Sequence, residues 1–259
     1  MITSVHNPRI KWVRSLQSDP AARREAGAFV VEGVRLAEEA LASGWPAQLL
    51  LYGDDLGARG RKVVDNFLAQ GAPVEIAAEH VLQAASDTQA PQGVLAVIEM
   101  RSLPLPPALD FAFIPDGVRD PGNLGSMLRT AVAAGVQAAL IPRGAVDAYA
   151  PKVVRAAMGA HFHLPIASLA WEEIAILLSR DKMQIYLADV AAGEPYYHCD
   201  LRGPLALIVG GEAQGAGEAA RRLAHATLHI PMASGVESLN AAAAASVLLF
   251  EVARQRAHP

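Results

Sequence analysis

The alternation of apolar runs and amphipathic segments along the chain predicts an α/β protein. In the first hundred residues, short apolar runs predict strands at 29–31, 49–52, 74–76 and 94–99. Apolar residues recurring at helical spacing predict helices between these strands, near 34–42, 61–70 and 79–85. This first part of the chain is therefore expected to form a small α/β domain.

Beyond residue 108 the same alternation continues on a larger scale. Strands are predicted at 111–115, 138–141, 184–188, 205–209 and 227–230. Helices are predicted at 124–134, near 151–158 and, in an alanine-rich stretch, from about 239 to 255. The run 205–209 is apolar throughout, which is typical of a parallel strand buried on both faces. We expect a mostly parallel sheet with helices covering both of its faces.

The clearest boundary between the two parts is rich in proline. Pro104, Pro106 and Pro107 favour extended backbone and interrupt both helix and sheet. The sequence therefore predicts an N-terminal domain over 1–100, a linker over 101–108 and a larger domain over 109–259.

Composition limits the class of protein. Of the 259 residues, 52% are hydrophobic, which is enough for a sizeable core, but no apolar run is long enough to span a bilayer. The N-terminal residues lack the basic-then-apolar pattern of a signal peptide, so we expect a cytosolic protein. Cys199 is the only cysteine, which excludes an internal disulfide and any zinc site built from several cysteines.

The charge pattern gives conflicting indications about nucleic acid. The net charge of −4 counts against an RNA- or DNA-binding protein, because the neutralisation of phosphates normally requires a surplus of cations. Cations nevertheless gather locally in residues 1–35, as Arg9, Lys11, Arg14, Arg23, Arg24 and Arg35. A second group comprises Arg143, Lys152, Arg155, His161 and His163. On charge alone, solvated helix faces are the favoured explanation of both groups.

The first of three unusual loops follows the predicted strand 111–115. The segment 120–123 should form a tight turn that leads into the helix carrying Arg129. Arg129 has apolar neighbours in the sequence, and burying its guanidinium would be costly unless an anion paired with it. The alternative is an outward-pointing Arg129 that bonds to nearby carboxylates, and this helix alone does not decide between the two.

The second loop follows the predicted strand 205–209. Gly210, Gly211 and Glu212 open it, and its glycine spacing does not match a dinucleotide-binding fingerprint. Glycines at a strand end let a ligand approach the backbone closely. Glu212 would either orient a substrate group or cap the following helix.

The third loop, 230–240, leads into the alanine-rich helix. Ser238 is placed to cap that helix, and Asn240 would then lie just inside it, where Asn has a mediocre propensity. Because ligands of parallel sheets bind outside the carboxyl ends of the strands, we expect the three loops to share one pocket. The residues by themselves indicate an α/β enzyme or nucleotide binder without naming its ligand.

The three loops closely resemble the motifs of the SpoU (TrmH-like) family of RNA 2′-O-ribose methyltransferases, in the SPOUT superfamily. The matching segments, in family order, are 120–125 with 129–131, 209–212 with Gly215, and 230–232 with 238–240. The resemblance covers about residues 109 to 256, and 151–155 with 158–160 resembles the family's intervening segment. The stretches 29–36 and 91–96 resemble the family's N-terminal L30e/L7Ae-like substrate-binding domain. RNA contact would then be local to the basic N-terminal region.

The resemblance implies a fold, a cofactor and site residues. It implies a parallel sheet with a deep trefoil knot, a homodimer, RNA as substrate and S-adenosylmethionine as cofactor, with no metal. The positions matching cofactor-binding residues are Gly210, Gly211, Ile230, Met232 and Leu239. The positions matching the polar catalytic set are Asn123, Arg129, Glu212, Ser238 and Asn240. The chain departs from many relatives at Ala242, where they have Ser, and at Gly211, which is often larger.

These implications lead to a mechanistic hypothesis. A guanidinium stays protonated in proteins, so Arg129 would bind the phosphate beside the target ribose and stabilise the developing alkoxide rather than act as a base. Ribosomal RNA is preferred over transfer RNA by family analogy alone. Two hypotheses of other classes stay open: a non-catalytic RNA-binding or ribosome-assembly factor, and a methyltransferase acting on a small molecule or a protein.

Overall fold

The structure, a computed structural model, describes residues 1–88, 91–191, 193–211, 215–233 and 235–257. These residues form two compact units. The first unit consists of Met1–Arg101 and Tyr149–Phe162, and the second consists of Ser102–Ala148 and His163–Pro259. The first unit ends within the proline-rich boundary region, but it also takes up 149–162, which the sequence had not indicated.

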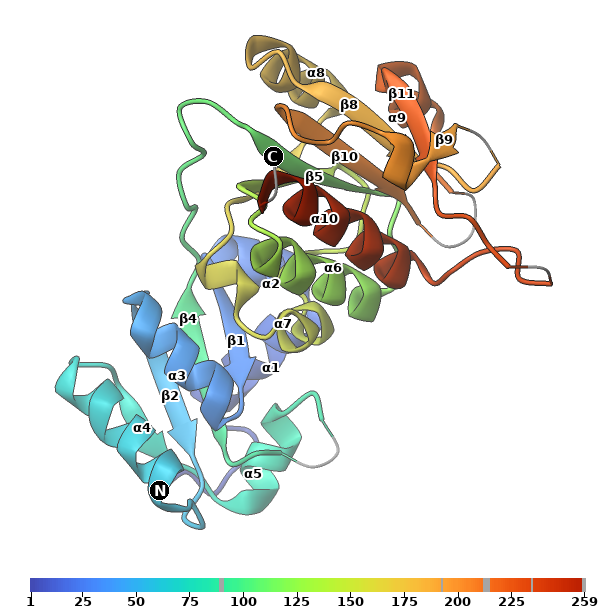
Figure 1. Cartoon of the computed structure of the whole chain (residues 1–259). Helices are drawn as coiled ribbons and strands as arrows, with labels where there is room; N and C mark the ends of the chain where they lie inside the picture. The colour runs from blue at the N-terminus through green and yellow to red at the C-terminus, as the bar shows by residue number, and fades with distance from the viewer. Residues whose placement is uncertain (89–90, 192, 212–214, 234, 258–259) are drawn as a thin grey trace. The chain divides into compact units, whose positions relative to one another are not determined.

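The first unit is built around a mixed sheet with the strand order β1-β4-β2-β3 (Figure 1). Its strands are β1 (Ala28–Glu32), β2 (Ala47–Tyr52), β3 (Val74–Ile76) and β4 (Val94–Glu99), close to the predicted ranges. Strand β4 pairs antiparallel with both neighbours, whereas β3 runs parallel to β2. The predicted helices are confirmed as α3 (Val34–Ser43), α4 (Ala58–Ala69) and α5 (Glu79–Ala85).

Two helices at the start of the first unit were not predicted. Helix α1 spans Pro8–Ser18 and α2 spans Pro20–Ala26. Asn7 caps α1, because its side-chain oxygen accepts a hydrogen bond from the Arg9 N–H at 2.9 Å. The buried residues of α1 are only Ile10, Val13 and Leu16, an apolar stripe that the surrounding cations obscure in the sequence.

An aromatic cluster anchors the segment 149–162 in the first unit. This segment contains α7 (Pro151–Ala157) and the 3-10 turn η1 (Ala160–Phe162). The ring of Phe29 on β1 lies 5.1 Å from that of Tyr149, centroid to centroid. Trp45 meets Phe162 edge-on, also at 5.1 Å. Because Phe29, Trp45 and Phe162 are each at most 5% exposed, burial of apolar surface holds the segment here.

The second unit contains the predicted parallel sheet. Its strand order is β7-β6-β5-β10-β8-β11-β9, and every pair of neighbours is parallel. The strands are β5 (Phe111–Asp116), β6 (Ala138–Pro142), β7 (Ile166–Leu169), β8 (Gln184–Ala188), β9 (Glu194–Pro195), β10 (Leu205–Gly210) and β11 (Ala226–His229). Strand β10 lies between β5 and β8, and its apolar run 205–209 is buried, as expected for a central parallel strand.

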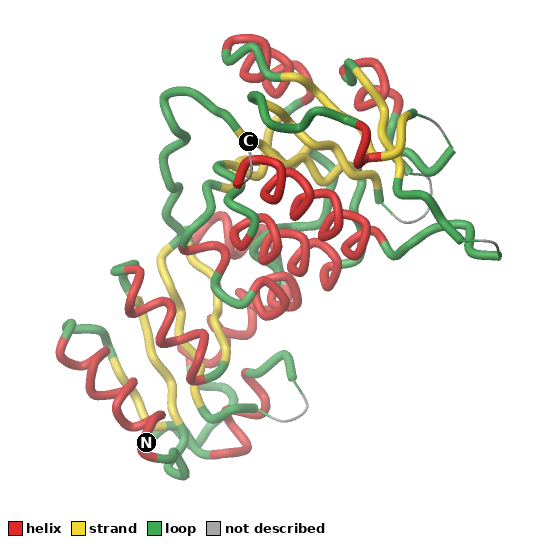
Figure 2. Tube along the Cα trace, in the orientation of Figure 1, coloured by secondary structure: helices red, strands yellow, loops and turns green. Residues whose placement is uncertain are grey.

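Helices cover both faces of this sheet, which confirms the predicted arrangement (Figures 1 and 2). Helices α6 (Pro121–Ala133) and α10 (Ala241–Ala257) lie side by side on one face, and the Thr130 and Ser246 hydroxyl oxygens are 3.2 Å apart. Helices α8 (Trp171–Arg180) and α9 (Glu218–Leu223) cover the other face. The strands β7 and β9 and the helices α8 and α9 were not predicted.

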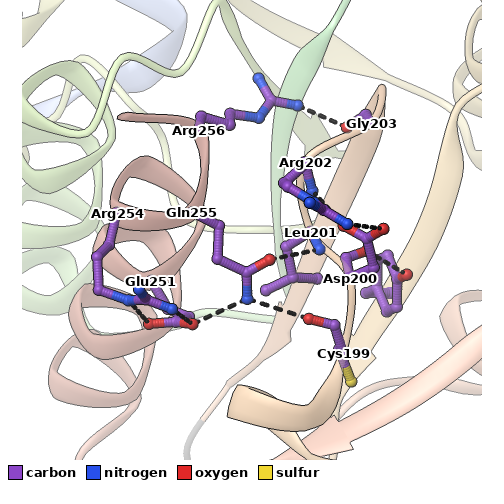
Figure 3. Close-up of polar contacts among 10 residues, drawn as sticks. Cys199, Asp200, Leu201, Arg202, Gly203, Glu251, Arg254, Gln255 and Arg256 are labelled. Carbon is purple, nitrogen blue, oxygen red and sulfur yellow. Dashed lines mark hydrogen bonds and ion pairs between the residues drawn. The ribbon is translucent and has the colours of Figure 1, made fainter. Parts of the chain in front are cut away.

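Hydrogen bonds fix the last turn of α10 to the loop that precedes β10 (Figure 3). The Gln255 amide nitrogen donates to the carbonyl of Cys199 at 3.0 Å, and its amide oxygen accepts from the Leu201 N–H at 2.8 Å. Arg256 donates to the carbonyl of Gly203 and to the carboxylate of Asp110, each at 2.7 Å. The C-terminal helix is therefore held against the starts of both central strands, β5 and β10.

Candidate functional site

A cavity of about 630 Å³ lies at the carboxyl ends of the central strands of the second unit. Its walls come from the ends of β8, β10 and β11 and from the start of α10. Seven of the predicted site residues line it: Gly210, Gly211, Ile230, Met232, Ser238, Leu239 and Asn240. The structure thus brings together all five predicted cofactor-binding positions and two of the polar set, and their roles stay predictions.

The two glycines of the second loop are required by the chain's own backbone. A Cβ atom on Gly210 would lie 2.3 Å from the backbone nitrogen of Ala216. A Cβ on Gly211 would lie 2.3 Å from the carbonyl oxygen of Gly117. We had expected these glycines to admit a ligand, but close packing between the loop and the strand ends is a sufficient reason for both.

Asp116, for which the sequence suggested no role, also holds this loop in place. It ends β5 and is only 7% exposed. Its carboxylate accepts a hydrogen bond from the Gly217 N–H at 2.6 Å, and its carbonyl accepts one from the Gly211 N–H at 2.8 Å. A carboxyl group at the end of an otherwise apolar strand was the available signal.

We predict that Asp116→Ala lowers both the free energy of unfolding and the affinity for S-adenosylmethionine. Loss of the carboxylate leaves the Gly217 N–H without its acceptor, which costs about 1–3 kcal/mol. Asp116→Asn is the matched control, because its amide oxygen still accepts this bond. Denaturant unfolding and calorimetric titration with S-adenosylmethionine should show a clear loss for Ala and a small one for Asn. Equal losses in the two variants would contradict this role.

Asn240 and Asn123 join the start of α10 to the start of α6. The Asn240 amide nitrogen donates to the Asn123 amide oxygen at 3.1 Å. The Asn240 amide oxygen accepts from the N–H groups of Ala242 and Ala243, at 2.9 and 3.2 Å. Asn240 is therefore the N-cap of α10, and the prediction that Ser238 caps this helix is wrong. The helix begins at Ala241, two residues later than predicted, so the cap shifts to Asn240.

Arg129 lies on the outer surface of α6 and does not line the cavity. The structure favours the outward-pointing alternative over a buried guanidinium. The expected carboxylate partner is missing, however, since no described residue forms a hydrogen bond or ion pair with the Arg129 side chain. A fully charged group is thus left available for an external anion. Glu212 lies outside the described residues.

Asp189 and Arg221 add a charged pair to the cavity wall that the sequence had not suggested. Asp189 follows β8, and its carboxylate forms an ion pair with Arg221. The Ala191 N–H and the Arg221 guanidinium hold the pKa of Asp189 below its ordinary value, so the carboxylate is ionised at neutral pH. Half of the Arg221 side chain stays exposed, at 49%, and can meet a further anionic group.

Two further observations concern the residues that the structure describes. Among the described residues, no group of three His, Cys, Asp or Glu side chains is placed to hold a metal ion. No helix in the described part of the chain is long and apolar enough to cross a membrane.

Comparisons with known proteins match both parts of the chain. Residues 110–250 match the SpoU rRNA Methylase family, and residues 7–96 match the MRM3-like substrate binding domain. Both matches agree with the resemblance noted in the sequence, and the first of them contains the three loops that line or adjoin the cavity.

Individual relatives are similar over almost their whole length. The 23S rRNA (guanosine(2553)-2'-O)-methyltransferase RlmP of Bacillus subtilis is 32% identical, over 97% of this chain and 98% of the relative. The SpoU methyltransferase AviRb from Streptomyces viridochromogenes, solved with AdoMet, has a TM-score of 0.87 and 31% identity, covering 98% of this chain and 99% of its own. An AdoMet-bound rRNA methyltransferase from Sinorhizobium meliloti has a TM-score of 0.87 and 32% identity, with 98% and 97% covered. The chain therefore belongs to the SpoU rRNA methylase family.

Proposed function

We propose that the protein transfers a methyl group from S-adenosylmethionine to a ribose 2′-hydroxyl of ribosomal RNA. The observation that carries this proposal is the single cavity lined by residues of the second and third family motifs. The similar enzyme from Bacillus subtilis is named for 2′-O-methylation of 23S rRNA, and two similar structures were solved with the cofactor. The second unit would carry out the transfer, and the first would bind the RNA.

The cavity suits a cofactor that is part apolar and part charged. Its apolar wall includes Ile230, Met232 and Leu239, which would contact the adenine and the sugar. Asp189 and the half-exposed Arg221 offer opposite charges to the ammonium and the carboxylate of the amino-acid portion. When bound, S-adenosylmethionine supplies a methyl group already activated by a sulfonium.

The protein's contribution to the chemistry is to manage the charge of the nucleophile. A ribose hydroxyl is a weak acid that must lose its proton, to the neighbouring phosphate or to a water, as its oxygen attacks the methyl group. Arg129 would bind the neighbouring phosphate through two parallel N–H bonds and stabilise the negative charge that develops on the oxygen. The bond between Asn240 and Asn123 would keep the amide groups oriented at the start of α6. Glu212 and Ser238 are proposed to complete this polar set.

A homodimer is part of the proposal, because Arg129 lies away from the cavity of its own subunit. On α10, Ala243, Val247 and Phe250 follow one another at helical spacing and are all exposed. Phe250 is 50% exposed although it is large and apolar. An apolar stripe beside α6 fits an interface that would bring Arg129 to a partner's cavity. The trefoil knot and the cytosolic location stay predictions.

We predict that Phe250→Glu prevents dimerisation. A charge placed in the apolar stripe would be buried without a partner in the interface. Light scattering should show a monomer, with methyl transfer lost and S-adenosylmethionine still bound. Ile176→Glu is the matched control: Ile176 on α8 is 71% exposed, on the other face of the sheet, and its variant should stay dimeric. A monomeric wild-type protein would contradict the dimer.

The direct test of the function is a transfer assay with radiolabelled S-adenosylmethionine and purified RNA. The radiolabel is expected in ribosomal RNA taken from cells that lack the protein. After alkaline hydrolysis of this RNA, the radiolabel should remain in dinucleotides, since a 2′-O-methyl group blocks cleavage of the adjacent bond. Label in transfer RNA would change the substrate class. Failure to bind S-adenosylmethionine would favour the non-catalytic factor, and transfer without RNA would favour a small-molecule or protein substrate.

A further inference from the structure

A second cavity, of about 420 Å³, lies in the first unit between α1 and the end of α5. One wall is a row of polar residues on α1: Lys11, Arg14, Ser15, Gln17 and Ser18. The opposite wall is the segment 84–87, which ends α5 and begins the following loop. We refer to this cavity as the α1–α5 groove.

The α1–α5 groove is bordered by cations that are not neutralised. Lys11 and Arg14 lie one helical turn apart and are both exposed. Within the described part of the chain, neither has an ion-pair partner. Asp87 is the acid among the described lining residues, and its carboxylate already accepts a bond from Arg155 of α7 at 2.7 Å. Arg155 thus neutralises this acid, and Lys11 and Arg14 give the groove its net positive charge.

The α1–α5 groove also has a buried hydrogen-bond acceptor that lacks a donor in the described part of the chain, on Gln17. The side-chain oxygen of Gln17 is buried and has no hydrogen-bond partner among the described residues. Buried acceptors without donors are uncommon in folded proteins and call for an explanation.

We propose that the α1–α5 groove binds the sugar–phosphate backbone of the substrate RNA. Lys11 and Arg14 would contact phosphates, and Gln17 would accept a hydrogen bond from a ribose 2′-hydroxyl. RNA supplies both the anions and the donors that the groove lacks, because its phosphates and 2′-hydroxyls alternate along one strand. This inference rests on the proposed function, since it names where the first unit contacts that substrate.

The test compares two double variants that change charge equally. Lys11→Glu with Arg14→Glu alters the groove, whereas Arg59→Glu with Lys62→Glu alters exposed cations on α4 of the same unit. Binding to a ribosomal RNA fragment is measured by fluorescence anisotropy at several salt concentrations. The groove variant should bind on the order of ten-fold or more weakly, with a salt slope lower by about 1 for each phosphate that the protein no longer neutralises. The control should retain most of its affinity.

Gln17→Leu tests the acceptor separately from charge. It should weaken binding to RNA by about five-fold, the equivalent of one hydrogen bond, and leave binding to DNA of the same sequence unchanged. Circular dichroism and calorimetry with S-adenosylmethionine check that each variant folds and keeps its second unit.

The outcomes separate the inference from the function on which it rests. If wild-type protein binds RNA and the two double variants lose equal affinity, the groove is not the contact surface and the inference fails. If wild-type protein binds no ribosomal RNA at all, the proposed function itself fails. Binding of an acidic peptide that the RNA fragment cannot displace would assign the groove to a protein partner and would also overturn the inference.

Discussion

Arg129→Ala is expected to abolish methyl transfer while S-adenosylmethionine remains bound with nearly unchanged affinity. The turnover number should fall by about a thousand-fold, the usual effect of removing a group that stabilises charge in the transition state. Cofactor affinity should persist because Arg129 is exposed on α6 and lines no part of the 630 Å³ cavity. Single-turnover kinetics and calorimetry measure the two quantities separately.

Two controls make the result specific to the guanidinium. Arg129→Lys keeps the charge but loses the paired N–H geometry, so partial activity is expected. Arg119→Ala removes another exposed arginine, on the loop that leads into α6, and should leave turnover largely intact. If Arg129→Ala lost cofactor binding and thermal stability together, Arg129 would be a structural residue and the charge hypothesis would be wrong.

Gly210→Ala is expected to distort the cavity and to weaken the binding of S-adenosylmethionine. The added carbon would lie 2.3 Å from the backbone nitrogen of Ala216 and 2.4 Å from the carbonyl carbon of Gly215. Backbone atoms cannot turn aside as a side chain can, so the loop itself must move. Such overpacking costs about 1–3 kcal/mol of stability. Affinity for S-adenosylmethionine should fall by roughly ten-fold or more, since each 1.4 kcal/mol is a factor of ten.

Gly217→Ala provides the matched control within the same loop. Its added carbon would lie 3.4 Å from the Asp116 carboxylate, an ordinary contact, and the backbone at Gly217 has a φ of −70° that any residue adopts. Denaturant unfolding and calorimetric titration should therefore show Gly217→Ala close to wild type. Gly210→Ala at wild-type affinity would mean that the loop adapts and that its packing does not shape the cavity.

The sequence was most informative where side-chain periodicity follows directly from burial. The central strand β10 is apolar throughout because both of its faces are covered, and its position was predicted within a residue. Helix α8 was missed because apolar residues run continuously from Ile174 to Leu178, although only Ile174 and Leu178 are buried. Ile176 in this run is exposed, so the helical spacing is hidden.

The cavity was predicted because the loops that follow parallel strands lie at the same edge of the sheet, where ligands bind. Asp116 and Asp189 were missed because their contribution depends on strand order, and β10 is inserted between β5 and β8 from far along the chain. Asn240 was predicted to lie inside the helix because the helix start was placed two residues early. Hydrogen-bonding partners across such distances leave no local pattern in a single sequence.

The position of the segment 149–162 was also beyond prediction from local pattern. It lies between β6 and β7 in the chain, yet its aromatic residues pack with Phe29 and Trp45 of the first unit. Deleting residues 1–100 to test RNA binding would therefore expose the aromatic side chains of this segment to water. Point variants in the α1–α5 groove are the sounder experiment.

The division of the chain into two units also determines whether proteolytic cleavage can separate the fragments. The polypeptide crosses from one unit to the other three times, near residues 101, 148 and 162, so the proline-rich stretch is not the sole tether. A protease that cuts this stretch once leaves α7 covalently attached to the C-terminal fragment. Phe162 would then still be inserted beside Trp45 of the N-terminal fragment. The two fragments should therefore stay associated as one particle. They should separate only when the contact between Phe162 and Trp45 is lost.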